Sequence, residues 1–337
     1  MIESICTPQE EGRRISVACD LFLDLKLYRL PEWAHTQLER RFPDVDIVEV
    51  NTPSSSLFSE QSEIYWGNRI TPDIIEKMPN LKWIHFGSVG VNRVNIQDLS
   101  RQNILVTSSK GGVVYPMVAS ALSFMTGLAR GVHYVQKMRE DGTMSRESFD
   151  AYFDRIHDLL GERCLIVGFG DVGKHLARVC DALGMHVSAI EREPSCHKLV
   201  DSSFTLDKLP DAVLEADYVI NLLPLNNDTK GVFNRKVFSR MSRNAFFINI
   251  GRGETVDEDA LIDALNKGVI AGAGLDVFAK EPLTIDSPLW KMENVMLSPH
   301  IAGLSQSYWK GQIELFQYNL KCYVENRSYS MKNLVNG

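Results

Sequence analysis

Apolar residues follow two spacings along the chain, and the alternation between these spacings predicts the fold. In the first part of the chain, the short apolar runs RISVACDLF, VDIVEV, EIYWG, LKWIHFG and ILVTSS are typical of strands. Stretches with helical spacing occupy several of the gaps, namely residues 32–41, PDIIEKM and VNIQDLSRQ. Strands that alternate with helices predict a mostly parallel sheet with helices on its faces.

A long helix and a second alternation follow. The segment MVASALSFMTGLARGVHYVQKMRED has helical spacing, no Pro and only two interior Gly, so we expect one continuous helix of about 25 residues. Further strands are predicted at RCLIVGF, HVSAIE, DYVINLL, AFFINIG, AGAGLDVF and NVMLSPH, with helices such as VGKHLARVCDALG and DEDALIDALNKG between most of them. The last segment, SYWKGQIELFQYNLKCYVEN, is again helical. The order predicts an α/β protein with two doubly wound parallel-sheet lobes.

Composition narrows the class of protein. The 337 residues suggest about two domains, and a hydrophobic content of 44% is enough for a sizeable core. A net charge of −7 without a run of Lys and Arg argues against nucleic acid or an anionic membrane as the main partner. No apolar run approaches the roughly 20 residues that span a bilayer, and the polar start MIESICTPQEEGRR lacks the apolar core of a signal peptide. We therefore expect a cytoplasmic protein.

The cysteines are spread along the chain without a C-x-x-C pair. This spacing predicts free thiols and no zinc or other metal site. The six residues are Cys6, Cys19, Cys164, Cys180, Cys196 and Cys322.

The stretch GFGDVG, residues 168–173, lies between the predicted strand RCLIV and the predicted helix VGKHLARVCDALG. The pattern G-x-G-x-x-G is a weak signal alone, but the strand–turn–helix context is that of a dinucleotide site. Gly168 would allow the tight turn, Gly170 would let the backbone approach a pyrophosphate, and Gly173 would let helix and strand pack closely. The pyrophosphate would lie at a helix N-terminus, where N–H groups and the helix dipole favour an anion.

The next predicted strand ends at Glu191, 18 residues after Gly173. An acid at about this distance meets the adenosine ribose hydroxyls of NAD, whereas a nearby Arg such as Arg192 can accept the 2′-phosphate of NADP. Because a carboxylate repels that phosphate, the sequence favours NAD(H). NADP(H) stays open, as does the interpretation of both residues as solvated turn positions.

Three polar residues follow late strands of the second alternation. Arg252 follows AFFINI, Glu281 follows AGAGLDVF, and His300 follows NVMLSP. Ligands of open α/β sheets bind outside the carboxyl ends of the strands, so these side chains can share one crevice. The set suits hydride transfer on a 2-oxo acid: the Arg binds and polarises the carbonyl, the His transfers a proton, and the Glu favours the protonated His. Alternatively, Arg252 lies in a solvated turn, Glu281 begins a helix and His300 is a structural histidine.

These features together resemble the D-2-hydroxyacid dehydrogenase family, the group of D-lactate, phosphoglycerate and hydroxypyruvate/glyoxylate dehydrogenases. The resemblance rests on GFGDVG, INIGRGETVDEDAL, GLDVFAKEPL, SPLW and LSPHIAG. It implies that a Rossmann nucleotide-binding lobe, residues 116–305, is inserted into a flavodoxin-like substrate lobe, residues 1–115 and 306–337. The long helix and the last helix would be the segments where the chain passes from one lobe to the other. The chain stops soon after NLVN, so no C-terminal regulatory domain is expected.

The resemblance also implies roles for individual residues. Arg252 would bind and polarise the substrate, His300 would be the general acid/base, and Glu281 would be its partner. Contacts to the substrate would also come from the loop in FGSVGVN, at Ser88, Val89 and Gly90. Contacts to the cofactor would come from Gly168, Gly170, Asp171, Val172, Gly173, Glu191, Arg192, Leu223, Pro224, Ile250, Asp276 and His300, with Asp276 near the nicotinamide.

The enzyme implied is an NAD(H)-dependent oxidoreductase that interconverts a small 2-oxo acid and a D-2-hydroxy acid, as a homodimer through the nucleotide-binding domain. Two departures from the family pattern stand out. Val118-Ala119-Ser120-Ala121 replaces a Val-Ala-Glu-His-like run in a helix that often forms the dimer contact, which leaves the partner geometry open. Trp66 and Arg69 stand where smaller residues are common, and they either shape substrate choice or pack at the rim.

Two other functions stay open on the same scaffold. One is a phosphite-type dehydrogenase. The other is a nucleotide-sensing protein like the family's transcriptional corepressors, which keep the same three polar residues; turnover of any 2-oxo acid would exclude it. Formate oxidation is disfavoured, because formate dehydrogenases carry Gln where Glu281 stands.

Overall fold

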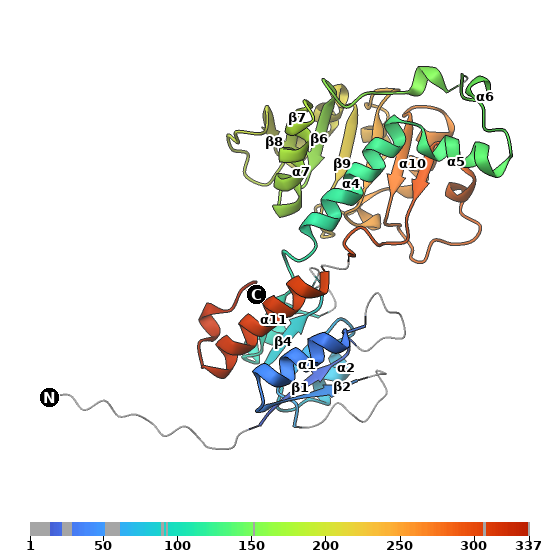
Figure 1. Cartoon of the computed structure of the whole chain (residues 1–337). Coiled ribbons are helices and arrows are strands. Elements are labelled where there is room, and N and C mark those ends of the chain that lie inside the picture. Colours follow the sequence, from blue (N-terminus) through green and yellow to red (C-terminus); the bar gives the residue numbers. More distant parts are fainter. Residues whose placement is uncertain are drawn as a thin grey trace. The chain divides into compact units, whose positions relative to one another are not determined.

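The computed structural model of the chain describes residues 14–21, 29–50, 61–88, 91, 94–150, 152–305 and 308–335. The chain forms two compact units, one of residues 1–112 with 305–337 and one of residues 113–304. Each unit contains one parallel sheet covered by helices on both faces (Figure 1). This arrangement confirms the predicted fold class.

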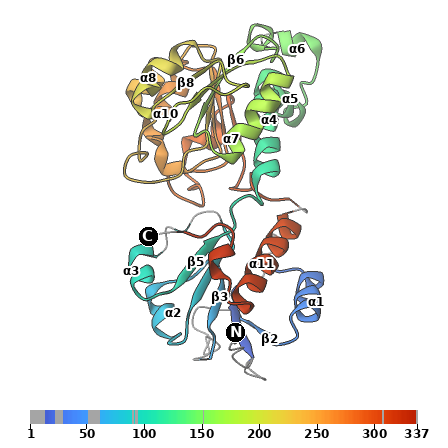
Figure 2. The same ribbon diagram turned by 90° about the vertical axis from the view of Figure 1, so that its left-hand side faces the viewer.

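The first unit is built from both ends of the chain. Its strands are β1 (Ile15–Cys19), β2 (Val45–Glu49), β3 (Ile64–Gly67), β4 (Trp83–Phe86) and β5 (Leu105–Ser108), and its helices are α1 (Glu32–Arg41), α2 (Pro72–Glu76), α3 (Ile96–Arg101) and α11 (Tyr308–Val324). The sheet has the order β2-β1-β3-β4-β5. Helices α1 and α11 pack on one face, and α2 and α3 pack on the other (Figure 2). The Val335 amide donates to the Val106 carbonyl at 2.9 Å, so the C-terminal segment runs beside β5.

The second unit has a larger sheet. Its strands are β6 (Arg163–Val167), β7 (His186–Ile190), β8 (Ser202–Phe204), β9 (Tyr218–Asn221), β10 (Phe246–Asn249), β11 (Gly272–Leu275) and β12 (Val295–Leu297). Its helices are α4 (Val114–Ala129), α5 (Val132–Glu140), α6 (Arg146–Asp150), α7 (Asp171–Ala182), α8 (Leu209–Ala212), α9 (Arg235–Phe238) and α10 (Glu258–Asn266). The strand order is β12-β11-β10-β9-β6-β7-β8. Helices α4 and α7 cover one face, and α8, α9 and α10 cover the other.

Two sequence predictions of secondary structure were wrong. The expected continuous helix is two helices, because Gly131 between α4 and α5 has a left-handed φ of 63°. A Cβ at Gly131 would lie 2.6 Å from the Tyr152 ring, so glycine is required both by the backbone conformation and by the packing. Strand β8 was not predicted, because its three half-buried residues at the edge of the sheet form no apolar run.

The described residues also bear on membranes, thiols and metals. None of their helices is long and apolar enough to cross a bilayer. The five cysteines within the described ranges are unpaired, and all but Cys196 are buried, whereas Cys6 lies outside those ranges. In the same part of the chain, no group of three or more His, Cys, Asp or Glu side chains could hold a metal ion.

Candidate active site

The loop GFGDVG connects β6 to α7 at the topological switch point of the second sheet. The chain continues from β6 to β7 on one side, and β9 lies on the other side of β6. Gly168 has a φ of 105°, and a Cβ there would lie 3.0 Å from the Leu222 carbonyl carbon. A Cβ on Gly173 would lie 2.7 Å from the Gly168 oxygen. Both glycines therefore allow backbone contacts that a side chain would prevent.

Gly170 is different, because a Cβ at this position would meet no atom within 4 Å. The space beside it lies at the N-cap of α7, a helix of 12 residues whose first turn includes Asp171 and Val172. The first N–H groups of a helix have no partner within the helix, so they can bind a phosphate. Leu223 and Pro224 follow β9, and Ile250 follows β10, at the same edge of the sheet. These residues fit a dinucleotide.

Glu191, at the end of β7, is held by its own loop. Its carboxylate accepts hydrogen bonds from the Ser203 hydroxyl at 2.5 Å and the Ser195 amide at 3.1 Å, and it lies 3.0 Å from Nε2 of His197. Burial raises the pKa of Glu191, but the hydrogen bonds outweigh burial and leave the pKa below its usual value. The carboxylate therefore stays ionised near neutral pH, next to the exposed Arg192.

The loop that carries Arg252 lies against the loop that leads to Glu281. A Cβ on Gly253 would fall 1.8 Å from the Phe278 carbonyl oxygen, so the two backbones touch at this point. The Arg252 guanidinium donates to the Gly251 carbonyl at 2.6 Å, and the side chain is partly exposed. The two loops that follow β10 and β11 thus meet at Gly253 and Phe278, which are 25 positions apart in the sequence.

His300 and Glu281 form a direct pair. Nδ1 of His300 is 2.6 Å from Glu281 Oε2, and Oε1 of Glu281 accepts the Phe278 amide at 3.1 Å. An acceptor at Nδ1 fixes the hydrogen on that atom and leaves Nε2 for a reacting group. The His300 side chain is 48% exposed, so a ligand can reach it.

Asp276 supports His300 from inside the protein. His300 has a φ of 56°, a conformation that is uncommon for residues other than glycine, and its amide donates to the Asp276 carbonyl at 2.8 Å. The Asp276 carboxylate, which is 1% exposed, accepts from Ile301 N at 2.8 Å and Ala302 N at 2.9 Å. Asp276, which follows β11, therefore supports the loop that carries His300, and its place near the nicotinamide stays a prediction.

The substrate residues predicted in the first unit lie in different surroundings. Ser88 follows β4 at the carboxyl edge of the sheet, whereas Val89 and Gly90 lie outside the described residues. Trp66 is fully buried and stacks on Phe316 with ring centroids 3.8 Å apart. Trp66 is therefore a core residue, and the expectation that it shapes substrate choice or packs at the rim does not hold.

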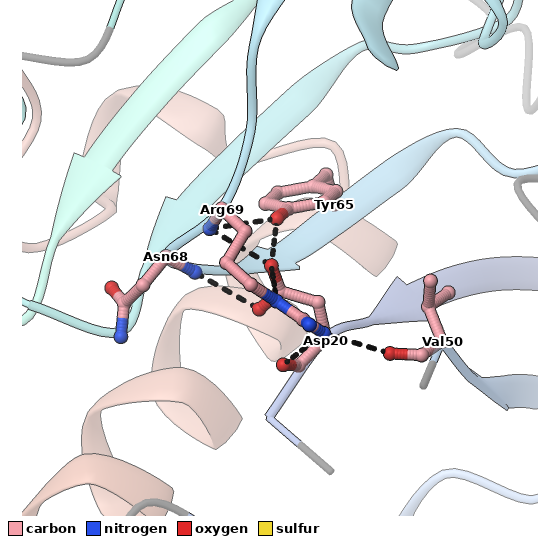
Figure 3. Close-up of polar contacts among 5 residues, drawn as sticks. All are labelled: Asp20, Val50, Tyr65, Asn68 and Arg69. Carbon is pink, nitrogen blue, oxygen red and sulfur yellow. Dashed lines mark hydrogen bonds and ion pairs between the residues drawn. The ribbon is translucent and has the colours of Figure 1, made fainter. Parts of the chain in front are cut away.

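Arg69 lies at the switch point of the first sheet, between β1 and β3 (Figure 3). Its guanidinium donates to the carbonyls of Asp20 at 3.1 Å and Val50 at 3.0 Å, and its amide donates to the Asp20 carboxylate at 2.8 Å. Asp20 also accepts from the Tyr65 hydroxyl, and a Cβ on Gly67 would lie 1.6 Å from the Asp20 carboxylate. Sequence reasoning missed Asp20. It follows β1 directly, so the strand-end rule applied to the early strands would have found it.

Comparisons with known proteins agree with this geometry. The NAD-binding domain model of the D-isomer specific 2-hydroxyacid dehydrogenases matches residues 122–302, and the catalytic domain model of the same family matches residues 61–118. Glyoxylate/hydroxypyruvate reductase B of Salmonella typhi is 32% identical over 311 residues, which are 89% of this chain and 92% of that protein.

Solved structures show the same likeness. A protein from Thermus thermophilus has a TM-score of 0.80 at 26% identity, covering 95% of this chain and 100% of its own. A D-isomer specific 2-hydroxyacid dehydrogenase from Xanthobacter autotrophicus, in complex with NADPH and MES, has a TM-score of 0.77 at 25% identity, covering 96% of this chain and 98% of its own.

Two doubly wound sheets with a dinucleotide loop at one switch point, together with the matched NAD-binding domain, place the chain among NAD-binding α/β proteins. The chain belongs to the D-isomer specific 2-hydroxyacid dehydrogenase family. It carries the NAD-binding domain of that family and acts as an oxidoreductase on the CH–OH group of 2-hydroxy acids. The predicted resemblance, enzyme class and NAD-type cofactor are confirmed.

Proposed function

We propose that this chain reduces a small 2-oxo acid to the D-2-hydroxy acid with NADH, through Arg252, Glu281 and His300. The pair between Glu281 and Nδ1 of His300, at 2.6 Å, carries the proposal. It leaves Nε2 of an exposed imidazole as the only ring atom able to exchange a proton with a ligand. The carboxylate also fixes the orientation of the ring, so that Nε2 faces a bound ligand in a constant direction.

The cofactor would be held by the edge of the second sheet. Gly170 and the first turn of α7 would bind the pyrophosphate, and Leu223, Pro224 and Ile250 would line the adjoining strand ends. The Glu191 carboxylate would accept hydrogen bonds from the ribose hydroxyls of the adenosine. This contact favours NADH over NADPH. NADH supplies a hydride for the carbonyl carbon when it is bound there.

The protein would supply charge and a proton. Arg252 would bind the substrate carboxylate and carbonyl oxygens, because a guanidinium offers several donors in a fixed plane. Its positive charge would stabilise the negative charge that develops on the carbonyl oxygen. His300 would donate the Nε2 proton to that oxygen, while Glu281 holds the ring in place through Nδ1.

The first unit would select the substrate. The loop at Ser88, Val89 and Gly90 would bind the substrate carboxylate, and Arg69, fixed at the switch point, would meet the distal part of the substrate. The 32% identical relative is named a glyoxylate/hydroxypyruvate reductase, which makes these two acids the first substrates to test. Residues 1–115 with 306–337 would thus be the substrate domain, and residues 116–305 the NAD-binding domain.

We also propose a cytoplasmic homodimer that forms through the NAD-binding domain. Large apolar side chains are exposed in this unit on and beside α4 and α5, including Tyr115 at 74% and Phe153 at 67% exposure. Such exposed apolar side chains could pack against a second copy of this unit.

The substitution His300→Ala tests the proposed function. Turnover of glyoxylate or hydroxypyruvate should fall by about 10²-fold to 10⁴-fold, the usual contribution of a general acid. The dissociation constant for NADH, measured by fluorescence titration, should stay unchanged. The exposed His186 at the start of β7 offers a matched control, and His186→Ala should keep full turnover. Unchanged turnover in His300→Ala would remove His300 from the mechanism.

A further inference from the structure

The segment that follows β7 folds back on Glu191 and brings His197 against it. Nε2 of His197 is 3.0 Å from Oε1 and 3.3 Å from Oε2 of Glu191, so one ring nitrogen lies close to both carboxylate oxygens. The His197 ring also packs on Phe169 of the loop GFGDVG, with ring centroids 4.8 Å apart. His197 therefore contacts both parts of the predicted dinucleotide site, the glycine loop and the acid at the end of β7.

These contacts decide which nitrogen of the neutral His197 ring carries the hydrogen. An ionised carboxylate can only accept, so Nε2 is the donor to Glu191. The Ser195 hydroxyl oxygen lies 3.0 Å from the same nitrogen. Nδ1 has no hydrogen-bond partner among the residues that the structure describes, and the side chain is 25% exposed. A second proton can therefore be added at Nδ1 without loss of the contact with Glu191.

Protonation of His197 changes the charge of the pair. Burial raises the pKa of the Glu191 carboxyl, but hydrogen bonds keep that pKa below its usual value. The carboxylate therefore stays charged through the pH range in which histidines change their charge. With a neutral ring the pair carries one negative charge, and with a protonated ring it carries none.

The groups around the pair do not titrate in the same range. Phe169 from the glycine loop and Ser203 from β8 face the pair, and neither side chain carries a charge. The other titratable side chains of the segment 191–198 are exposed; they are Arg192, Glu193, Cys196 and Lys198. Their residue types do not titrate near about pH 6.5, where histidine does. The charge at this end of β7 therefore follows the protonation of the histidine.

We propose that His197 determines cofactor choice through its charge: the neutral ring leaves Glu191 to repel a 2′-phosphate, whereas the protonated ring cancels that charge and admits NADPH. The inference rests on the proposed function, in which the Glu191 carboxylate accepts hydrogen bonds from the adenosine ribose. NADH has no 2′-phosphate, so its binding should depend little on the charge of His197. Binding of NADPH and protonation of His197 should favour each other, because coupling between two ligands is reciprocal.

Titration of the full chain with NADH and with NADPH, at about pH 5.5 and about pH 7.5, tests the proposal without a substrate. Cofactor fluorescence gives the Kd in each case. The 2′-phosphate itself takes up a proton near about pH 6, as phosphate monoesters do, so the ligand contributes part of any pH effect. The substitution His197→Gln separates the two contributions, since its amide can still donate to Glu191 but cannot be protonated.

The rise in the Kd for NADPH between the two pH values should be about tenfold larger in the unaltered protein than in His197→Gln. The Kd for NADH should change by less than about twofold in both proteins. His197→Arg carries a permanent charge, so its Kd for NADPH at the higher pH should be about tenfold lower than that of the unaltered protein. Both substitutions lie in a partly exposed loop, which protects the fold.

His186→Gln is the matched control. His186 is an exposed histidine at the start of the same strand, and its Nδ1 lies 3.5 Å from the Asp201 carboxylate. Its replacement should leave the pH dependence of NADPH binding unaltered. An equal pH effect in the unaltered protein and His197→Gln, or a Kd for NADPH in His197→Arg that is no lower, would overturn the inference alone. A Glu191→Gln variant that binds NADPH no better at the higher pH would instead contradict the role of Glu191 in the proposed function, and the inference with it.

Discussion

At the scale of single residues, we expect cofactor choice to depend on the charge of Glu191. The carboxylate is ionised and held by Ser203, Ser195 and His197, so it cannot easily turn away from an approaching 2′-phosphate. At an effective dielectric constant of about 20, two unit charges about 4 Å apart interact by about 4 kcal/mol. We expect repulsion of this size to outweigh the attraction that the exposed Arg192 would offer through solvent.

Glu191→Gln should therefore shift the enzyme toward NADPH. The amide keeps the size and an acceptor oxygen but removes the charge that repels the phosphate. We expect kcat/KM for NADPH to rise about tenfold or more, because removal of about 1.4 kcal/mol of repulsion suffices for this factor. Steady-state rates with both cofactors measure the change, and Glu193→Gln, at an exposed acid two residues further on, should leave the ratio unaltered. A parallel response in the two variants would contradict the role of Glu191.

At the scale of elements, the break between α4 and α5 follows from one glycine and its contact with Tyr152. Gly131 and Gly142 have nearly the same φ, 63° and 67°, but a Cβ at Gly142 would meet nothing within 4 Å. The two positions therefore separate the cost of the left-handed backbone from the cost of the clash. The left-handed conformation costs an alanine about 1–2 kcal/mol.

Gly142→Ala should lower the thermal midpoint by only a few degrees, as expected for about 1 kcal/mol. Gly131→Ala carries the same backbone cost plus the overlap with Tyr152, so its midpoint should fall further. Differential scanning calorimetry of the two variants measures the difference. Equal midpoints would show that the ring of Tyr152 moves aside without cost.

The same elements show what the sequence could predict. Helix α1 begins at Glu32 and ends at Arg41 as predicted, and the main strands coincide with the apolar runs, because both patterns are local. The apolar spacing continues through Gly131, so it did not predict the left-handed turn there or its packing against Tyr152, 21 positions later.

The sequence likewise predicts some residues of the candidate site and not others. The strand-end rule indicated Arg252, Glu281 and His300, because parallel strands carry their following residues to a common edge. Ser109 follows β5 and Tyr308 begins α11, yet their hydroxyls donate to the neighbouring carbonyls of Phe86 and Gly87, and no sequence pattern predicts such a meeting. The burial of Trp66 could not be predicted for the same reason, since it depends on the Phe316 ring of α11.

At the scale of the whole molecule, the two units carry different spectroscopic and acid–base groups. Four of the five tryptophans, Trp33, Trp66, Trp83 and Trp309, belong to the first unit, so intrinsic fluorescence reports mainly on its unfolding. The buried, neutral His85 belongs to the same unit and lies beside Trp83 and Trp66, with ring centroids 5.8 and 6.4 Å away. Fluorescence-detected unfolding therefore observes the unit in which this histidine resists protonation.

The first unit should lose stability as the pH falls below about 6.5, the ordinary pKa of histidine. Between that value and the folded-state pKa of about 3, His85 binds a proton in the unfolded chain but not in the folded chain. The free energy of unfolding therefore falls by about 1.4 kcal/mol for each pH unit. Above about pH 6.5 both states are neutral at this position, and His85 adds no pH dependence. Urea midpoints, measured by tryptophan fluorescence, should fall between pH 7 and pH 4. In His85→Gln the midpoints should fall less steeply with pH, because unfolding takes up as much as one proton fewer. A variant whose midpoints run parallel to those of the unaltered chain would show that His85 takes up its proton without unfolding the unit, since acidic groups elsewhere contribute equally to both curves.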